Sequence, residues 1–93
     1  MIKGFANSGT EKLFTGERSK ILPANLNRIA YRKLRYLHNA ENLNDLRVPP
    51  GNHLEKLTKD RKGQHSIRIN EKYRICFTWK NGNAYKVEVT DYH

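Results

Sequence analysis

The chain has 93 residues, with 18 Lys and Arg against 9 Asp and Glu, and a formal net charge of +9. This length has room for one domain, residues 1–93, and buries only about two-thirds of the surface that the unfolded chain exposes, which excludes a large enclosed cofactor pocket. The excess charge is +5 in residues 1–50 (9 minus 4) and +4 in residues 51–93 (9 minus 5), and it indicates a polyanionic partner, either nucleic acid or an acidic protein.

The single cysteine, Cys76, excludes an internal disulfide and zinc sites that need several thiolates. No apolar run approaches the roughly 18 residues of a membrane-spanning helix. The start of the chain, MIKGFANSGTEK, lacks the apolar stretch of a signal peptide. We therefore expect a cytoplasmic protein without a membrane partner.

The first half of the chain has a helical pattern. IKGF near the start alternates apolar and polar residues, as a short half-buried strand does. Thr10 then caps an expected helical turn that carries Leu13 and Phe14. The clearest helix covers residues 23–40, where Pro23 suits the first turn and apolar residues recur every three or four positions. Its other face carries charged residues, which suit solvent or a docking role equally: Arg28, Arg32, Lys33 and Arg35.

A short second helix is expected at ENLNDLRV, and the tandem prolines of PPGN end it. From residue 53 onward the period changes to two. LEKL, HSIRIN, YRICFTW and AYKVEVTDY are typical of four strands, and the residues 80–83 between the last two form a hairpin turn. Helices followed by a run of strands predict an α+β fold with an antiparallel sheet.

Alternation sorts the strand residues by face. Tyr73, Ile75, Phe77 and Trp79 share one side of their strand, and Tyr85, Val87 and Val89 are expected to pack inward with them. Because helices cover only one side of so small a sheet, the other side is expected to be exposed and positively charged. We expect it to present Arg68, Arg74 and Tyr92.

Such a surface suits the cleavage of RNA without a metal or another cofactor. The 2′-hydroxyl of RNA attacks the neighbouring phosphate if the site removes one proton, donates another and neutralises the phosphorane charge. Arg binds that charge through its forked donors, His and Asp exchange protons, and Tyr stacks on a base. Exposed Arg and His are common on basic proteins, so this inventory by itself favours an ordinary surface.

The order of several motifs makes a more specific case. PPGN, DRKGQHSIRIN, YRICF and the closing VTDYH, together with the MIKGF start and the AYRKL helix, cover nearly the whole chain. In this order they resemble the HigB, or killer protein, branch of the RelE/ParE toxin superfamily.

The resemblance implies a type II toxin that acts as a ribosome-dependent endoribonuclease on translated mRNA, inhibits translation and needs no metal. It implies a RelE-like compact domain, with an N-terminal strand and two helices packed on a curved, mainly antiparallel sheet. The implied partners are the ribosome, mRNA and a HigA-like helix-turn-helix antitoxin, with operator DNA bound only through the antitoxin complex.

Carried over onto this sequence, the family's catalytic residues fall on Arg74, Asp91, Tyr92 and His93. The resemblance implies that Arg74 stabilises the phosphate charge, that His93 and Asp91 handle protons, and that Tyr92 positions the nucleotide. Residues expected to bind RNA or the ribosome are Arg28, Arg32, Lys56, Lys59, Arg61 and Arg68.

The chain also departs from the family. Some members carry a histidine and a lysine where this chain has Glu55 and Thr58, so the resemblance does not assign the general base. Lys56 or Lys59 could supply the missing charge, and His53 or His65 could reach the site, although each also suits an ordinary surface position.

Two other functions stay open at this point. ParE-like members of the superfamily inhibit DNA gyrase without cutting RNA, and that action does not need Arg74 together with Tyr92 and His93. A generic RNA-binding module is a further alternative, but the chain lacks an aromatic-rich RNP run and a GXXG loop.

Overall fold

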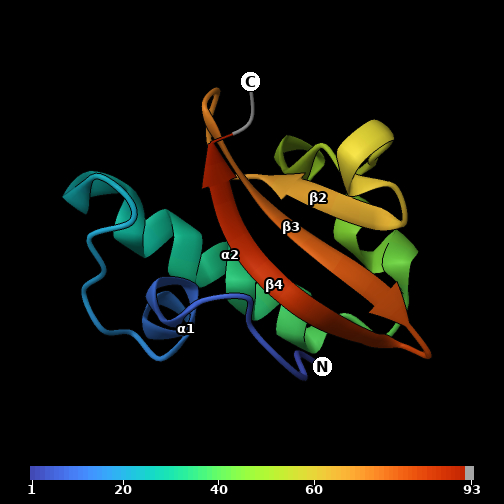
Figure 1. Ribbon diagram of the computed structural model, residues 1–93, viewed down its shortest axis with the longest axis horizontal. Coiled ribbons are helices and arrows are strands. Elements are labelled where there is room, and N and C mark those ends of the chain that lie inside the picture. The colour runs from blue at the N-terminus through green and yellow to red at the C-terminus, as the bar shows by residue number, and fades with distance from the viewer. Residues whose placement is uncertain (92–93) are drawn as a thin grey trace.

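The computed structural model describes residues 1–91, which fold into helices packed on a four-stranded antiparallel sheet (Figure 1). The helices are α1 (Ser8–Phe14) and α2 (Asn27–Asn39), and the strands are β1 (Glu55–Lys56), β2 (Gln64–Arg68), β3 (Tyr73–Lys80) and β4 (Asn83–Asp91). The strand order is β1-β2-β3-β4, so each strand pairs with its neighbour in sequence. The predicted α+β class is confirmed.

The first helix, α1, begins at a residue whose side chain caps it. Asn7, not Thr10 as expected, caps α1 by accepting a hydrogen bond from the Thr10 N–H at 2.8 Å. The Thr10 hydroxyl instead accepts from the Val89 N–H at 3.1 Å and so ties α1 to β4. The long helix expected at residues 23–40 is confirmed as a short 3₁₀ turn, Ala24–Leu26, followed by α2.

The connections differ from expectation in two places. The expected short second helix is a five-residue 3₁₀ helix, Leu43–Arg47, and not an α-helix, and PPGN forms a further 3₁₀ turn, Pro50–Asn52. The expected N-terminal strand is reduced to two isolated parallel bridges to β4, from Ile2 and from Phe5. The hairpin turn after β3 is confirmed, since Asn81 and Gly82 both have positive φ, 53° and 78°.

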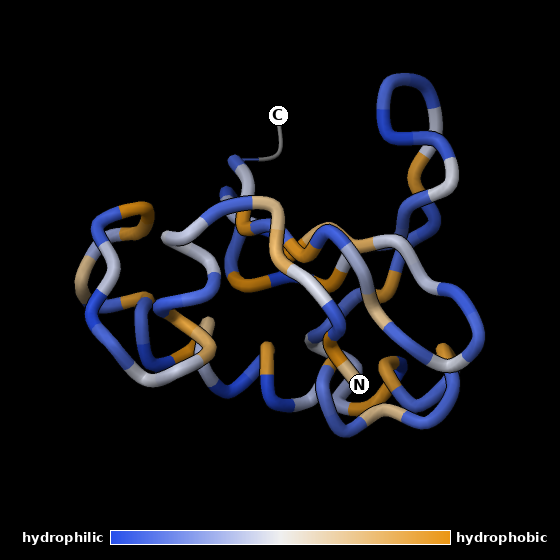
Figure 2. Tube along the Cα trace, turned by 60° about the horizontal axis from the view of Figure 1, so that its bottom comes forward, coloured by the Kyte–Doolittle hydropathy of each residue, from blue (hydrophilic) through white to orange (hydrophobic). Residues whose placement is uncertain are grey.

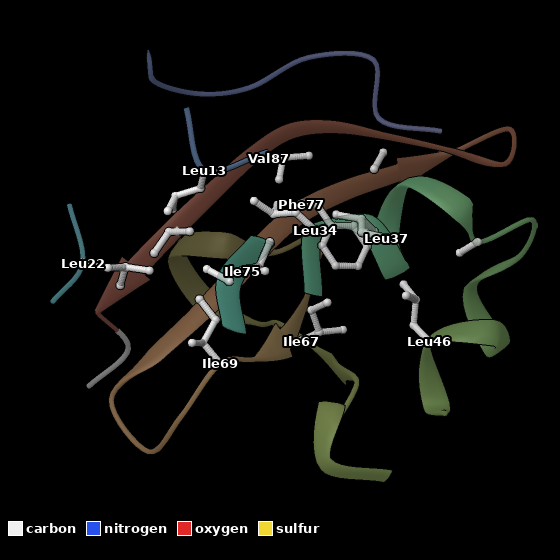
Figure 3. Close-up of a cluster of buried hydrophobic side chains, with 14 of the residues drawn as sticks. Leu13, Leu22, Leu34, Leu37, Leu46, Ile67, Ile69, Ile75, Phe77 and Val87 are labelled. Atoms are coloured by element: carbon white, nitrogen blue, oxygen red, sulfur yellow. The ribbon is translucent and has the colours of Figure 1, made fainter. Parts of the chain in front are cut away.

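The core lies between α2 and one face of the sheet (Figure 3). Leu34 and Leu37 of α2 point toward Phe77 and Ile75 of β3, and all four are fully buried. Burying each such side chain contributes about 1.5–3 kcal/mol, so this contact fixes which face of the sheet the helices cover. Hydrophilic stretches lie in the loops at the rim of the molecule (Figure 2).

The predicted faces are correct for β2 and β3 but wrong for part of β4. Cys76 pairs with Glu88 and Thr78 pairs with Tyr85, so β4 has one residue more than β3 in this interval. This β-bulge includes Lys86, whose φ is +52°. Because the extra residue inverts the alternation beyond it, Ala84 is buried in the core and Tyr85 is not.

The second face of the sheet is covered as well, which contradicts the expected open surface. Residues 53–61, which include β1 and the 3₁₀ turn Lys59–Arg61, lie at the β2 edge of the sheet (Figure 1). From this edge the His53 carbonyl and Glu55 contact Arg74, and Arg61 pairs with Glu88. Arg74 is 9% exposed and Cys76 is fully buried. Lys33 was expected on the charged helix face that suits solvent or docking, but it is also buried, at 7% exposure.

Candidate functional site

Arg74 lies in the middle of the covered face and is held by two segments of the chain. Its Nε donates to the Ser66 hydroxyl of β2 at 2.7 Å, and its Nη2 donates to the His53 backbone carbonyl at 2.6 Å. Because a guanidinium is planar, acceptors on two of its nitrogens fix both its position and the orientation of its plane.

A carboxylate lies beside this guanidinium. The Glu55 Oε2 is 3.6 Å from the Arg74 Nη2, and the Glu55 side chain is half exposed. Glu55 reaches Arg74 because β1 pairs it directly with Ser66, the residue that also binds the Arg74 Nε. The face therefore combines a fixed cation with a carboxylate that solvent or a ligand can reach.

The pairing of the strands places one residue from each of the four strands in a row across this face. Glu55 is opposite Ser66, Ser66 is opposite Cys76, and Cys76 is opposite Glu88. Cys76 is buried at the centre of this row, and burial raises the pKa of its thiol, which disfavours the thiolate. Cys76 therefore has the environment of a passive residue of the sheet and not of a nucleophile.

Two of the arginines expected to bind RNA lie on this face with different surroundings. Arg68 is directly opposite Arg74 in the β2–β3 register, and its Nε donates to the Asn70 carbonyl at 3.1 Å. Arg61 forms an ion pair with Glu88 at 3.0 Å and a hydrogen bond with Gln64 at 3.0 Å. Arg68 thus adds positive potential next to Arg74, whereas Arg61 fastens residues 59–61 to the sheet.

Lys56 and His65 are opposite each other and project from the other face of β1 and β2. His65 stacks on Phe77, with ring centroids 6.2 Å apart, and burial and the Lys56 charge lower its pKa. Neither side chain is brought to Arg74. The side chain of His53 is exposed, and its contribution to the site is its backbone carbonyl.

The expected terminal residues are only partly described. Tyr92 and His93 lie outside the described residues. Asp91 ends β4 opposite Tyr73, so alternation places its side chain on the face of Tyr73 and Val89, not on the face of Arg74. Its carboxylate is 3.6 Å from the Lys72 ammonium.

The remaining basic residues lie elsewhere. Arg28 and Arg32 are exposed on α2, which packs on the opposite face of the sheet from Arg74. Arg28 lines a groove of about 400 Å³ between α2 and the segment after α1, together with Arg18 and Tyr31. Lys59 is exposed in the turn Lys59–Arg61.

The arrangement around Arg74 can bind and polarise a phosphate. The guanidinium and its neighbour Arg68 supply positive charge, and a nearby carboxylate can accept a proton. Within residues 1–91, no three His, Cys, Asp or Glu side chains gather as they would around a metal ion. In the same residues no helix is long and apolar enough to cross a membrane.

Sequence reasoning missed three contributors to this site, namely Ser66, the His53 carbonyl and the contact of Glu55 with Arg74. Alternation did place Ser66 on the same face as Arg74. The other two depend on where residues 53–56 cross the sheet, and no local pattern gives that position.

The sequence of the chain is similar to sequences of known proteins. The model of the family described as RelE-like toxin of type II toxin-antitoxin system HigB matches residues 3–93. Toxin HigB-1 of Vibrio cholerae is 41% identical over 68 residues, which cover 73% of this chain and 72% of that protein. Endoribonuclease HigB of Proteus vulgaris is 34% identical over 94 residues, which cover 100% of each.

Solved structures show the same fold. A YafQ mutant from E. coli has a TM-score of 0.59 at 15% identity, covering 98% of this chain and 91% of that one. YoeB in a heterotetrameric YoeB-YefM toxin-antitoxin complex from Staphylococcus aureus has a TM-score of 0.58 at 18% identity, covering 100% and 95%. These similarities confirm the expected RelE-like fold.

Proposed function

Because the chain belongs to the HigB family of RelE-like toxins from type II toxin-antitoxin systems, we propose that it is an endoribonuclease that cuts mRNA on the ribosome and so stops growth. The observation that carries the proposal is the fixed Arg74 guanidinium, held by Ser66 and the His53 carbonyl beside the Glu55 carboxylate.

In this proposal the RNA supplies its own nucleophile. The 2′-hydroxyl loses its proton and its oxygen bonds to the adjacent phosphorus, while the bond from phosphorus to the 5′-oxygen breaks. The leaving oxygen takes up a proton, and the products carry 2′,3′-cyclic phosphate and 5′-hydroxyl ends. Arg74 stabilises the negative charge that develops on the phosphorane, where a fixed donor is most effective.

Protons must move at both ends of this reaction. Glu55 is the carboxylate that the fold brings beside Arg74, and we assign to it the removal of the proton from the 2′-hydroxyl. His93 donates to the leaving oxygen and Tyr92 positions the nucleotide, as the family resemblance implies. Asp91 stays in the proposal as a proton-handling group at the end of β4, although its side chain projects from the opposite face to Arg74.

The proposed partners follow from the charge and from the family. An antitoxin neutralises the toxin, and a HigA-like protein with a helix-turn-helix is the kind we propose. Arg28, Arg32, Lys56, Lys59 and Arg68 contact RNA of the ribosome or the message, and the protein acts in the cytoplasm. Arg61 acts instead through its ion pair with Glu88.

The proposal is tested by sequencing the 5′ ends of cellular mRNA after a short pulse of expression. New cuts on translated messages are expected with the wild-type chain. Arg74→Ala should lower the cleavage rate by about 10²–10³-fold with little change in ribosome affinity, because the lost charge contact forms mainly in the transition state. Intact mRNA in the presence of DNA damage would reject the nuclease and favour inhibition of gyrase.

A further inference from the structure

Lys33 of α2 is a buried charged residue that the proposed chemistry does not use. It is 7% exposed, and its ammonium donates to the Asn52 side-chain oxygen at 2.5 Å. Burial, with a smaller contribution from the neighbouring Arg32, lowers its pKa. A lysine is rarely retained in such a position unless its donors are paired, so its partner is informative.

That partner, Asn52, is fully buried and uses both ends of its amide. The oxygen accepts from Lys33, and Nδ2 donates to the carbonyls of Leu46 and Val48 at 3.2 and 3.3 Å. Asn52 therefore joins α2 to the 3₁₀ turn Leu43–Arg47 and to the chain that follows it. Because both the oxygen and the nitrogen of this amide have hydrogen-bond partners, the side chain holds the backbone of Asn52 in place.

The next residue provides the carbonyl that holds Arg74. His53 has φ 43° and ψ 59°, a left-handed conformation that is uncommon for a residue other than glycine. Its N–H donates to the Pro50 carbonyl at 3.1 Å, and its own carbonyl accepts from the Arg74 Nη2 at 2.6 Å. The conformation of this turn therefore determines where the His53 acceptor of Arg74 lies.

Ser66 and His53, which both accept from Arg74, differ in how they are supported. Ser66 is in the middle of the sheet, paired with Glu55 on one side and Cys76 on the other. The His53 carbonyl belongs to a connection between a 3₁₀ turn and the two-residue strand β1. This connection needs an anchor outside the sheet, and the contact of Asn52 with Lys33 provides one.

We propose that Lys33 and Asn52 are positioning residues that hold the turn at His53, so that its carbonyl keeps the Arg74 guanidinium oriented toward the phosphate. The inference rests on the proposed nuclease function. It assigns to the core helix a role in catalysis that acts through hydrogen bonds and not through contact with RNA. Displacing a catalytic group by about 1 Å can cost on the order of 10²-fold in rate.

The test uses two substitutions that break the network at different points. Lys33→Met keeps an apolar stem and removes the ammonium, and Asn52→Asp keeps an acceptor for Lys33 while removing the two amide donors. Lys12→Met, an exposed lysine of α1, is the matched control. Single-turnover cleavage is measured on ribosomes saturated with each protein, at a temperature where circular dichroism shows each to be folded. We expect a 10- to 100-fold loss for both network variants, unchanged ribosome affinity and a normal rate for the control.

A double-mutant cycle separates positioning from general damage. In the Arg74→Ala background, Lys33→Met should lower the rate no further, because the residue through which it acts is absent. If the losses multiply, or if a folded Lys33→Met protein cleaves at the wild-type rate, the positioning role is wrong. Lys33→Gln keeps a donor for Asn52 and should retain part of the cleavage rate that Lys33→Met loses. It replaces Lys33→Met in the test if the methionine variant does not fold.

A measurement independent of cleavage keeps the inference distinct from the proposed function. Hydrogen exchange of the Arg74 Nη2 protons, which donate to the His53 carbonyl, is followed by NMR and should be slow in the wild-type protein and faster in the Lys33→Met and Asn52→Asp variants. A wild-type chain that cuts no mRNA would reject the nuclease but leave this exchange result standing. Unchanged exchange in both variants would reject the positioning role even in an active nuclease.

Discussion

A buried guanidinium keeps one orientation only if its donors find acceptors, and Arg74 finds them in segments far apart in sequence. Ser66 comes from the neighbouring strand and His53 from the connection before β1. Lys in place of Arg74 would present one ammonium where two nitrogens now make separate contacts. We therefore expect Arg74→Lys to recover little of the cleavage rate that Arg74→Ala loses.

Glu55 is the residue whose role the sequence left undecided, and its contact with Arg74 makes a specific prediction. If its carboxylate removes the 2′-hydroxyl proton, Glu55→Gln should lower single-turnover cleavage by about 10²–10⁴-fold. Glu55→His should recover part of the rate and introduce an acid limb near pH 6.5, where histidine titrates. The pH–rate profile of each variant on saturated ribosomes checks this.

The control for this prediction is Glu41→Gln, a change at an exposed glutamate of the loop after α2, which should have no effect. If Glu55→Gln lowers the rate but Glu55→His leaves the pH profile unchanged, the carboxylate only compensates the charge of Arg74. A Glu55→Gln variant with the wild-type rate would remove Glu55 from the chemistry.

At the scale of elements, the β-bulge in β4 decides which side chains face the core. It requires a positive φ of 52° at Lys86, which an L-residue adopts at a cost of about 1–2 kcal/mol. The bulge buries Ala84 opposite Trp79 and turns Tyr85 to the other face, opposite Thr78. A single backbone conformation thus inverts the predicted pattern of the first residues of this strand.

This conformation makes glycine favourable at one position of the sheet. Lys86→Gly should leave the protein at least as stable as the wild type and up to about 1 kcal/mol more stable, because glycine adopts positive φ without steric cost. Lys80→Gly, at an exposed position of β3, should destabilise by about 0.5–1 kcal/mol. Urea unfolding of the three proteins measures both. Equal destabilisation by the two glycines would show that Lys86 is not strained.

At the scale of the whole molecule, the two faces of the sheet have separate tasks. One face packs on the helices and supplies the core, and the other carries Arg74 under residues 53–61. The exposed Arg28 and Arg32 of α2 therefore lie on the side away from Arg74, where they can bind RNA without taking part in cleavage.

This separation predicts different effects on binding and on catalysis. Replacing Arg28 and Arg32 by Ala should weaken ribosome binding and reduce its salt dependence, since each lost phosphate contact removes roughly 0.7–0.9 from the slope of log affinity against log salt. Cleavage by ribosomes already saturated with toxin should stay near normal. Binding titrations at several salt concentrations measure the slope, and an unchanged slope would mean that α2 is merely solvated.

The stability of the molecule should depend on pH through two histidines. The Ile2 N–H donates to the His38 Nδ1 at 3.2 Å, and burial, Arg35 and the amino terminus lower the His38 pKa. Burial and Lys56 lower the pKa of His65. Because both groups bind protons more readily in the unfolded chain, their contribution is complete above about pH 6.5 and declines as the pH falls below it.

Thermal unfolding between pH 8 and pH 5.5 tests this dependence. The midpoint should fall toward the acid end, and the double variant His38→Gln, His65→Phe should show a flatter profile than the wild type. A wild-type midpoint that stays constant over this range would contradict the two lowered pKa values.

The sequence by itself determined the fold class, the long helix, the strands and the hairpin turn, because each depends on a local period or on residues that accept positive φ. The order of PPGN, YRICF and the closing motif pointed to the toxin family, which the comparisons confirmed. Alternation also separated Ile75 and Phe77 from Arg74 correctly.

Only the tertiary structure decided what covers the second face of the sheet. The burial of Arg74 and Lys33, and the contact of Glu55 with Arg74, depend on where residues 52–56 meet the sheet and α2. The face of Tyr85 likewise depends on register and a bulge. These features come from pairings between residues distant in sequence, and a periodicity of two or 3.6 residues carries no information about such pairings.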